Sequence, residues 1–412
     1  MKPTMTAIAL ALGMLGVTPA VAATAQQPAA APASEARKIS VSKEAYAAIK
    51  ALQDAVDAQD TTNTPALVAA AQAVAKTPDD RYMIAQLQLR AAAATKDDAR
   101  IRQAIEAVFA SGAADPAQVV PLYLNLGRIQ FNAKEYDQAG ASFEKVLAAQ
   151  PAHIEALTHL AETRFSQGRK GDAVGLLQKA ILTRTAAGQK ADEAWYKRAM
   201  SIAFDAGMPA AVEISRQWVA AYPSAANWRD AIRVYRKVGN PTEAMTLDML
   251  RLARVTGALE GDNDFEVYMY QAGEGGTPGE AKAVLQEAIA ANKIDPTRDS
   301  YKQGLPVVNR KAAGESVNLE KKTAAALAGS AAAPVVAVAD SNFGRGDYAK
   351  AAELYRTALG KSGADADLIN LHLGMALARA GDKAGAAAAL KAVGGPRAEV
   401  AKYWLVYVGS PA

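Results

Sequence analysis

The stretch FNAKEYDQAGASFEKVLAAQP, residues 131–151, decides the fold, because its pattern returns at residues 165–181 and again at residues 343–363. In the first and third copies a Phe is followed five residues later by Tyr, eight residues later by Ala and twelve residues later by a second aromatic residue. The middle copy keeps the Phe and the Ala but has Lys170 in the Tyr position. Such recurrence indicates a repeat architecture, and repeat proteins usually bind other molecules rather than transform them.

The first copy resembles the tetratricopeptide repeat (TPR), a helix-turn-helix unit of about 34 residues. The resemblance is carried by Leu126, Gly127, Phe131, Tyr136, Ala139, Phe143 and Pro151. It implies that Gly127 and Ala139 lie where two helices approach closely, and that Pro151 ends the second helix. The next unit follows without a gap and is marked by Leu157, Leu160, Ala161, Phe165, Gly168, Ala173, Leu177 and Ala180.

Weaker copies extend the array in both directions. Two of them place Trp195 and Trp228 in the aromatic position of the repeat. Near the C-terminus, residues 335–363 and 368–396 form a pair, and residues 398–408 are typical of a capping helix. Helical periodicity starts near residue 40, and no segment alternates like a β-strand. We therefore expect an all-α fold, which the resemblance implies to be a TPR-like helical-hairpin solenoid, a right-handed superhelix with a short C-terminal arm.

The spacing of the copies predicts one break in the array. The distance from Phe131 to Phe343 is not a whole number of repeats, so the register changes between them. Residues 294–331 are the expected place, because Pro, Gly and Ser interrupt the helical pattern there. The expected organisation is a signal peptide at 1–23, a flexible linker at 24–39, a helical TPR-like array at 40–293, an irregular linker or hinge at 294–331 and a C-terminal TPR pair with its capping helix at 332–412.

Residues 1–23 have the layout of a secretory signal peptide. Lys2 is followed by an apolar run at residues 7–17, and small residues then allow cleavage after Ala22 or Ala23. The alternative is a retained membrane anchor, which the two glycines and the proline of this segment disfavour. The chain has no Cys, so disulfides and thiolate metal sites are excluded. We expect a periplasmic or secreted protein without a stable transmembrane span after cleavage.

Composition and motifs argue against catalysis and against nucleic-acid binding. The formal net charge of +4 is too small to indicate a nucleic-acid partner by itself. The segment GEGGTPGE has Pro278 where a dinucleotide-binding loop needs its third Gly. His153, His159 and His372 form no ligand-like pair, and none has an obvious carboxylate partner in the sequence. The sequence therefore predicts no catalytic residues, no metal and no cofactor, which makes a hydrolase the weakest functional hypothesis.

Candidate binding residues follow from the register of the repeats. In the family that the chain resembles, polar side chains on the first helix of each hairpin line the concave face and contact ligands. The resemblance thus implies a partner-binding groove formed by Asn125, Arg128, Asn132, His159, Glu162, Lys197, Arg229, Arg233 and Arg236. The last three share one face of the helix at residues 227–239, where they suit an acidic peptide segment or a terminal carboxylate. The alternative is that they form an ordinary solvated helix face.

The sequence favours a non-enzymatic, protein-binding scaffold or adaptor of the bacterial periplasm or cell envelope. Its partners would be proteins or peptides held on the concave face of the repeat array. The competing hypothesis is an envelope polysaccharide- or peptidoglycan-associated factor, in which aromatic residues and arginines of the groove would contact a glycan. The identity of the partner is not encoded in these patterns.

Overall fold

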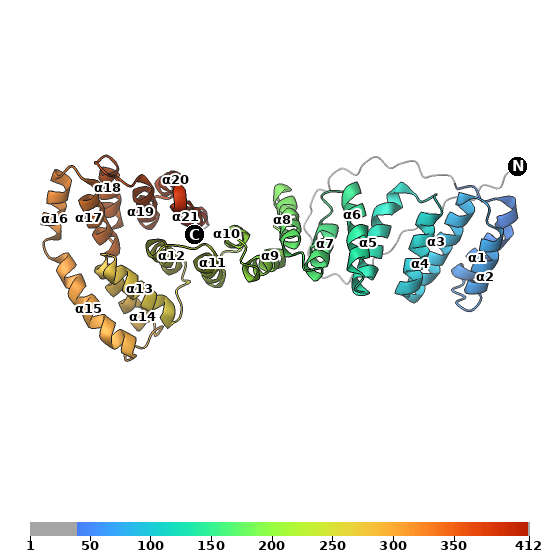
Figure 1. The fold of residues 1–412 in the computed structure, drawn as a ribbon, viewed down its shortest axis with the longest axis horizontal. Coiled ribbons are helices and arrows are strands. Elements are labelled where there is room, and N and C mark those ends of the chain that lie inside the picture. The colour runs from blue at the N-terminus through green and yellow to red at the C-terminus, as the bar shows by residue number, and fades with distance from the viewer. Residues whose placement is uncertain (1–38, 411–412) are drawn as a thin grey trace. The chain divides into compact units, whose positions relative to one another are not determined.

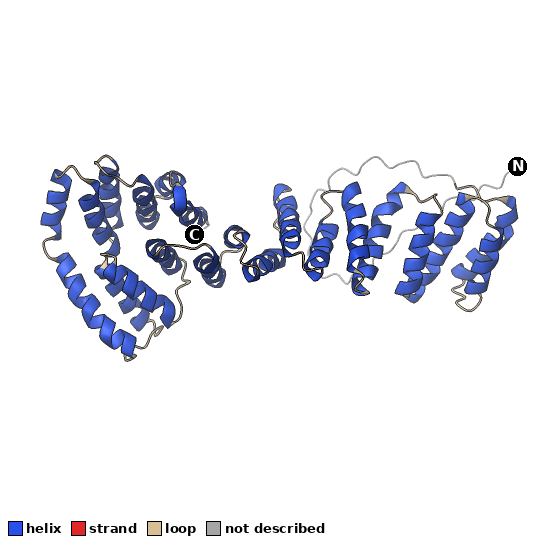
Figure 2. Ribbon diagram, viewed as in Figure 1, coloured by secondary structure: helices blue, strands red, loops and turns tan. Residues whose placement is uncertain are grey.

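The computed structural model describes residues 39–410, and within this range every regular element is a helix (Figure 1, Figure 2). The expected signal peptide and nearly all of the expected linker lie outside the described residues. The α-helices run from α1 to α21, with one 3-10 helix, η1, before the last of them. The predicted all-α class is confirmed.

Two compact units divide the chain between Leu176 and Leu177, inside α8 (Lys170–Ala186). The first unit contains α1 (Lys43–Asp57), α2 (Thr64–Val74), α3 (Pro78–Thr95), α4 (Asp98–Ala110), α5 (Pro116–Asn132), α6 (Tyr136–Ala149) and α7 (Ile154–Ser166). The second contains α9 (Glu193–Asp205), α10 (Ala210–Ala221), α11 (Ala225–Val238), α12 (Glu243–Val255), α13 (Asp262–Glu274), α14 (Pro278–Ala290), α15 (Asp299–Ser316), α16 (Leu319–Ala328), α17 (Ala332–Gly344), α18 (Tyr348–Leu359), α19 (Ala366–Arg379), α20 (Lys383–Lys391), η1 (Gly395–Arg397) and α21 (Ala398–Gly409). The expected boundary at residues 294–331 therefore falls inside the second unit.

The close approach of two helices at Gly127 is confirmed in the first unit. A Cβ added to Gly127 on α5 would lie 2.6 Å from the nearest ring carbon of Phe143 on α6, much closer than carbon atoms pack. Phe143 and Ala139 are completely buried between the helices. The same arrangement recurs in the second unit, where a Cβ on Gly374 would lie 2.5 Å from the side chain of Leu390. The small residue of the repeat is thus required by packing rather than by backbone conformation.

Asp80 joins the start of α1 to the start of α3. Its buried carboxylate accepts hydrogen bonds from the backbone N–H groups of Ser42 (2.8 Å), Lys76 (3.0 Å) and Thr77 (3.0 Å), and from the Ser42 hydroxyl (2.9 Å). Burial raises the pKa of Asp80, but the four hydrogen bonds outweigh it and hold this pKa below its usual value. The Ser42 hydroxyl also accepts from the backbone N–H of Ala45 and caps α1.

The expectation of an irregular segment at residues 294–331 is wrong, because most of it forms the helices α15 and α16. Pro306 lies inside α15, and Asn318, in the left-handed conformation, separates the two helices. The α15 helix packs on α13 and α14. Tyr301 is fully buried there and its hydroxyl donates to the backbone carbonyl of Asp262 (3.2 Å). The segment is therefore part of the packed unit.

The C-terminal helices do not form a separate arm, because they pack back onto the middle of the second unit (Figure 1). The α21 helix contacts α10 and α12, and α17 contacts α14. Tyr403 is buried and its hydroxyl donates to the backbone carbonyl of Val212 (2.9 Å), while the indole N–H of Trp404 donates to that of Asp248 (3.2 Å). One apolar core extends from α10 to α21. The last helix therefore closes the unit rather than only capping its end.

Candidate functional site

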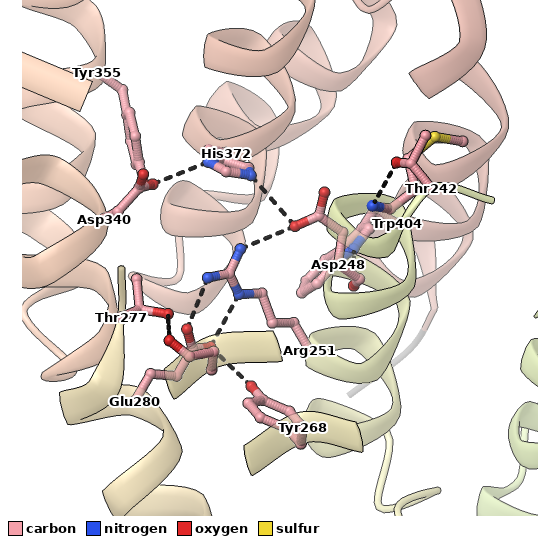
Figure 3. Close-up of polar contacts among 12 residues, drawn as sticks. Thr242, Asp248, Arg251, Tyr268, Thr277, Glu280, Asp340, Tyr355, His372 and Trp404 are labelled. Atoms are coloured by element: carbon pink, nitrogen blue, oxygen red, sulfur yellow. Dashed lines mark hydrogen bonds and ion pairs between the residues drawn. The ribbon is translucent and has the colours of Figure 1, made fainter. Parts of the chain in front are cut away.

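A buried ionic network lies where these returning helices meet α12 and α14 (Figure 3). The Arg251 guanidinium on α12 contacts the carboxylate of Glu280 through Nε (2.9 Å) and Nη2 (2.7 Å), and donates through Nη1 to Asp248 (2.9 Å). The Tyr268 hydroxyl donates to the same Glu280 carboxylate (2.7 Å). The side chains of Arg251, Asp248 and Glu280 are exposed by only 6%, 2% and 1%, so these charges depend on one another for stabilisation.

His372 extends the network from α12 to α17 and α19. Its Nε2 lies 3.3 Å from Asp248 and its Nδ1 lies 3.0 Å from Asp340, which also accepts from the Tyr355 hydroxyl. Burial lowers the pKa of His372, but the two carboxylates outweigh it and raise this pKa to about 9. The imidazole is therefore positively charged at neutral pH. The sequence shows no obvious carboxylate partner for any histidine, but His372 has two in the folded chain.

The network joins helices that are far apart in the chain. Its carboxylates are those of Asp248, Glu280 and Asp340, and they pair with the cations Arg251 and His372. The side chains of Asp248, Glu280 and Tyr268 are buried from solvent. Arg251 and Asp248 come from α12, Glu280 from α14 and His372 from α19, so the contacts fix the C-terminal helices to the middle of the unit. Among residues 39–410 no cluster of three His, Asp or Glu side chains suits a metal ion.

The arginines of α11 do not present unpaired positive charges. Arg229 pairs with Glu260 and donates to the backbone carbonyl of Ala258 (3.3 Å). Arg236 donates to Asp264 (2.6 Å), and the highly exposed Arg233 pairs with Asp230 (2.9 Å) on its own helix. The chain itself thus supplies an acidic partner for each of the three arginines. The solvated, ion-paired helix face is the better interpretation of these residues.

Lys197 is likewise engaged within the second unit. Its ammonium lies 3.0 Å from Glu193, four residues earlier on α9, and 5.5 Å from the ring centre of Trp218. The Glu193 carboxylate also accepts from the indole N–H of Trp218 (3.0 Å) and from the Asn227 side chain (3.1 Å). Lys197 therefore stabilises a local cluster that links α9, α10 and α11.

The remaining predicted residues form what we call the α5–α7 face of the first unit. It comprises Asn125, Arg128 and Asn132 on α5, with His159 and Glu162 on α7. Within the described residues, the side chains of the three α5 residues make no hydrogen bond or ion pair, and Arg128 and Asn132 are exposed. The two helices contact each other, so the structure brings these residues into one region.

His159 packs against an aromatic ring of the repeat core. Its ring stacks on Phe143 with a centroid distance of 5.4 Å and an interplanar angle of 12°. Burial is the main cause that lowers the pKa of His159, and the positive charge of Arg128 lowers it further, against the opposing effect of Glu155, whose carboxylate lies 3.6 Å from Nε2. The imidazole is therefore neutral at pH 7 and offers hydrogen bonds without a charge.

The sequence does not reveal the ionic network, because its members are far apart in the chain. A weak signal is present: Asp248 and Arg251 interrupt the apolar segment TLDMLRLA, and Asp340 follows the apolar segment VVAVA. Charged residues on an otherwise apolar helix face indicate buried ion pairs.

Within residues 39–410, no helix combines the length and apolar character that a membrane crossing requires.

Comparisons with known proteins agree with the repeat geometry. One tetratricopeptide repeat family model matches residues 130–191, and a second matches residues 337–398. No curated protein sequence matches the chain.

Among solved structures, the chain aligns with a tetratricopeptide repeat protein from Parabacteroides merdae at 12% identity, over 72% of this chain and 99% of that chain, with a TM-score of 0.32. It aligns with the MamA protein at 18% identity, over 48% of this chain and 96% of that chain, with a TM-score of 0.28. Because these scores are low, the assignment rests on the two family models and on the helix packing at Gly127 and Gly374. Repeats of this kind build surfaces for protein interaction. Residues 130–191 and 337–398 are therefore tetratricopeptide repeat segments.

Proposed function

We propose that the protein is an exported scaffold or adaptor of the cell envelope, which holds partner proteins or peptides through the α5–α7 face. One observation carries this assignment. Within the described residues, no polar partner is found for Asn125, Arg128 and Asn132. By contrast, Lys197 and the three α11 arginines each form an ion pair inside the chain.

The chemistry of this face suits a polar or acidic segment of polypeptide. Arg128 provides a guanidinium that can bind a carboxylate through two hydrogen bonds. The amides of Asn125 and Asn132 can donate and accept, as can the neutral imidazole of His159. The face contains one acidic side chain, Glu162, which already has an interaction within the chain. A partner could therefore form hydrogen bonds with the side chains of Asn125, Arg128 and Asn132.

Export is the second part of the proposal and is supported by the layout of residues 1–23. Mass spectrometry of the intact protein from its native cells tests it. A mature chain that begins at Ala23 or Thr24 and is found in the soluble envelope fraction is the expected result. A chain that keeps Met1 and sediments with membranes would contradict export while leaving the binding face untouched.

Site-specific photo-crosslinking tests the binding face in cells. A photoreactive residue is placed at Asn132, on the face, or at Lys145, an exposed position on α6, as the matched control. We expect the variant with the probe at position 132 to give a discrete crosslinked protein that position 145 does not give. The same crosslinked product should weaken when Arg128→Gln is added. Equal crosslinking from both positions, insensitive to Arg128→Gln, would contradict the proposal.

A further inference from the structure

The first unit contains two cavities outside the α5–α7 face. A cavity of about 340 Å³ lies between α2, α3 and α4, close to the C-terminal end of α3 at Ala91 and Thr95. A second cavity, of about 220 Å³, lies near the N-terminal end of α3 at Arg81 and Ile84. Gln72 and Gln88 line both cavities. The two cavities lie along α3, next to α2 and α4, and we refer to them together as the α3 groove.

The dimensions of the α3 groove suit a short extended segment. From Arg81 to Thr95 a helix rises about 20 Å, at about 1.5 Å per residue. An extended chain covers that distance with about six residues, at about 3.3 Å each. Both α2 and α4 contribute residues to each cavity, although Gln72 is the one α2 residue that lines the smaller cavity.

The polar lining of the α3 groove consists mainly of amides and hydroxyls. The larger cavity is lined by Gln59, Gln72, Gln88, Gln103, Thr61, Thr64 and Thr95. Its two charged side chains are occupied: Asp60 accepts hydrogen bonds from Asn63 and from backbone N–H groups, and Arg100 pairs with Asp97 (3.3 Å). In the smaller cavity the one charged side chain, Arg81, donates to the backbone carbonyl of Lys76 (3.4 Å). The larger cavity therefore offers neutral donors and acceptors rather than free charge.

Gln88 is the strongest indication that something binds here. Its Oε1 atom is buried from solvent and has no hydrogen-bond partner within the described residues. A buried acceptor without a partner costs free energy, which a donor on a bound ligand would recover. Small side chains beside it, including Ala69, Ala91 and Ala94, let a ligand backbone come close to the helices.

We propose that the α3 groove binds an extended, uncharged segment of a partner polypeptide through its main-chain amides. A glutamine side chain has the same donor and acceptor groups as a peptide unit, so Gln72, Gln88 and Gln103 match main-chain N–H and C=O groups. The lining residues of the two cavities include no aromatic ring that could stack on a sugar, which disfavours a glycan. The proposal rests on the proposed scaffold function and adds a second contact region to it.

The test uses a displayed library of random dodecapeptides, selected on the purified full chain. The selected peptides are synthesised and titrated by fluorescence anisotropy against wild type, Gln88→Leu and Gln72→Ala. Gln150→Ala, an exposed glutamine at the end of α6, is the matched control. We expect Gln88→Leu to weaken binding about tenfold and Gln72→Ala about three- to tenfold, because each removes a hydrogen bond to the peptide backbone. The control should bind like wild type.

A separate experiment tests whether the groove recognises the main chain of the peptide rather than its side chains. N-methylation of single peptide bonds in the ligand should weaken binding more than alanine substitution of its side chains. Circular dichroism confirms that each variant is folded, and Gln72→Ala, at an exposed position, keeps the test valid if Gln88→Leu is unstable. Selected peptides that bind all variants equally, or that tolerate N-methylation, would overturn the proposal. So would binding of envelope oligosaccharides, but of no peptide, to this groove.

Two further measurements test whether the chain's own segment fills the groove and whether the α3 groove acts independently of the α5–α7 face. Peptide binding that appears only after residues 24–38 are deleted would mean that the chain's own segment fills the groove, which contradicts a partner ligand. Arg128→Gln should leave peptide binding to the α3 groove unchanged, and Gln88→Leu should leave crosslinking from position 132 unchanged. The α5–α7 face and the α3 groove can therefore fail independently.

Discussion

Replacing Gly127 by Ala tests the packing on which the repeat assignment depends. The new Cβ would lie 2.6 Å from one ring carbon of Phe143 and 2.9 Å from two others, where about 3.5 to 4.0 Å is the normal separation. Phe143 is completely buried, so its ring cannot move into solvent. Overpacking of this kind costs about 1–3 kcal/mol. The higher helix propensity of Ala relative to Gly offsets about 1 kcal/mol of this cost. The expected net loss is therefore up to about 2 kcal/mol.

Gly175→Ala is the matched control, because Gly175 also lies inside a helix of the TPR segment but a Cβ there would meet no atom within 4 Å. This substitution should stabilise the first unit by about 1 kcal/mol through helix propensity alone. Thermal unfolding followed by circular dichroism should show the two variants moving in opposite directions, by about 2–4 °C per kcal/mol. Equal stabilisation by both would refute the close approach of α5 and α6. The penalty at Gly127 should also shrink in a Phe143→Leu background.

Four other changes test the polar interactions of the two units. Asp80→Asn should cost about 1–3 kcal/mol in urea unfolding at pH 7, because it weakens four hydrogen bonds. Since the folded pKa of Asp80 is lowered, its contribution is present above the usual value of 3.8 and is lost as the pH falls through the folded pKa, so wild type and variant should converge in acid. For His372, whose pKa is raised from 6.5 to about 9, the contribution is complete below pH 6.5 and is lost as the pH rises to about 9; His372→Gln should remove that decline from the stability profile. Arg251→Met should cost about 3–5 kcal/mol, because two buried carboxylates lose their contact with the guanidinium, although Asp248 keeps His372 and Glu280 keeps Tyr268. Arg233→Gln, at an exposed pair, should cost less than about 1 kcal/mol.

The local features of the fold can be predicted from the sequence because they repeat. Gly127, Ala139 and Phe143 recur at fixed spacing, and each position has one packing role that any copy of the hairpin must satisfy. The cap at Ser42 is likewise a local property, since its hydroxyl accepts from a backbone N–H three residues later. Helix class, hairpin packing and helix starts therefore follow from short stretches of chain.

Features that depend on distant segments were not predictable in this way. The proline at 306 suggests a break, yet α15 continues through it because the helix packs on α13 and α14. The return of α21 to α10 and α12 depends on Tyr403 and Trp404, whose aromatic character alone does not identify their partners. The partners of the α11 arginines could not be predicted for the same reason. Periodicity gives the face on which they lie but not Glu260 and Asp264, which neutralise two of them.

Titration of the crosslinked partner against purified variants is the most direct test of the α5–α7 face. The variants are the triple change Asn125→Ala, Arg128→Gln and Asn132→Ala, and a control with Arg229, Arg233 and Arg236 all changed to Gln. We predict that the first weakens binding by more than tenfold while remaining folded, since a charge-assisted hydrogen bond contributes about 1.5–3 kcal/mol. The control should bind within about twofold of wild type, because its arginines are paired inside the chain. Unchanged affinity in the first variant, with a large loss in the second, would contradict the assignment and return the binding surface to α11.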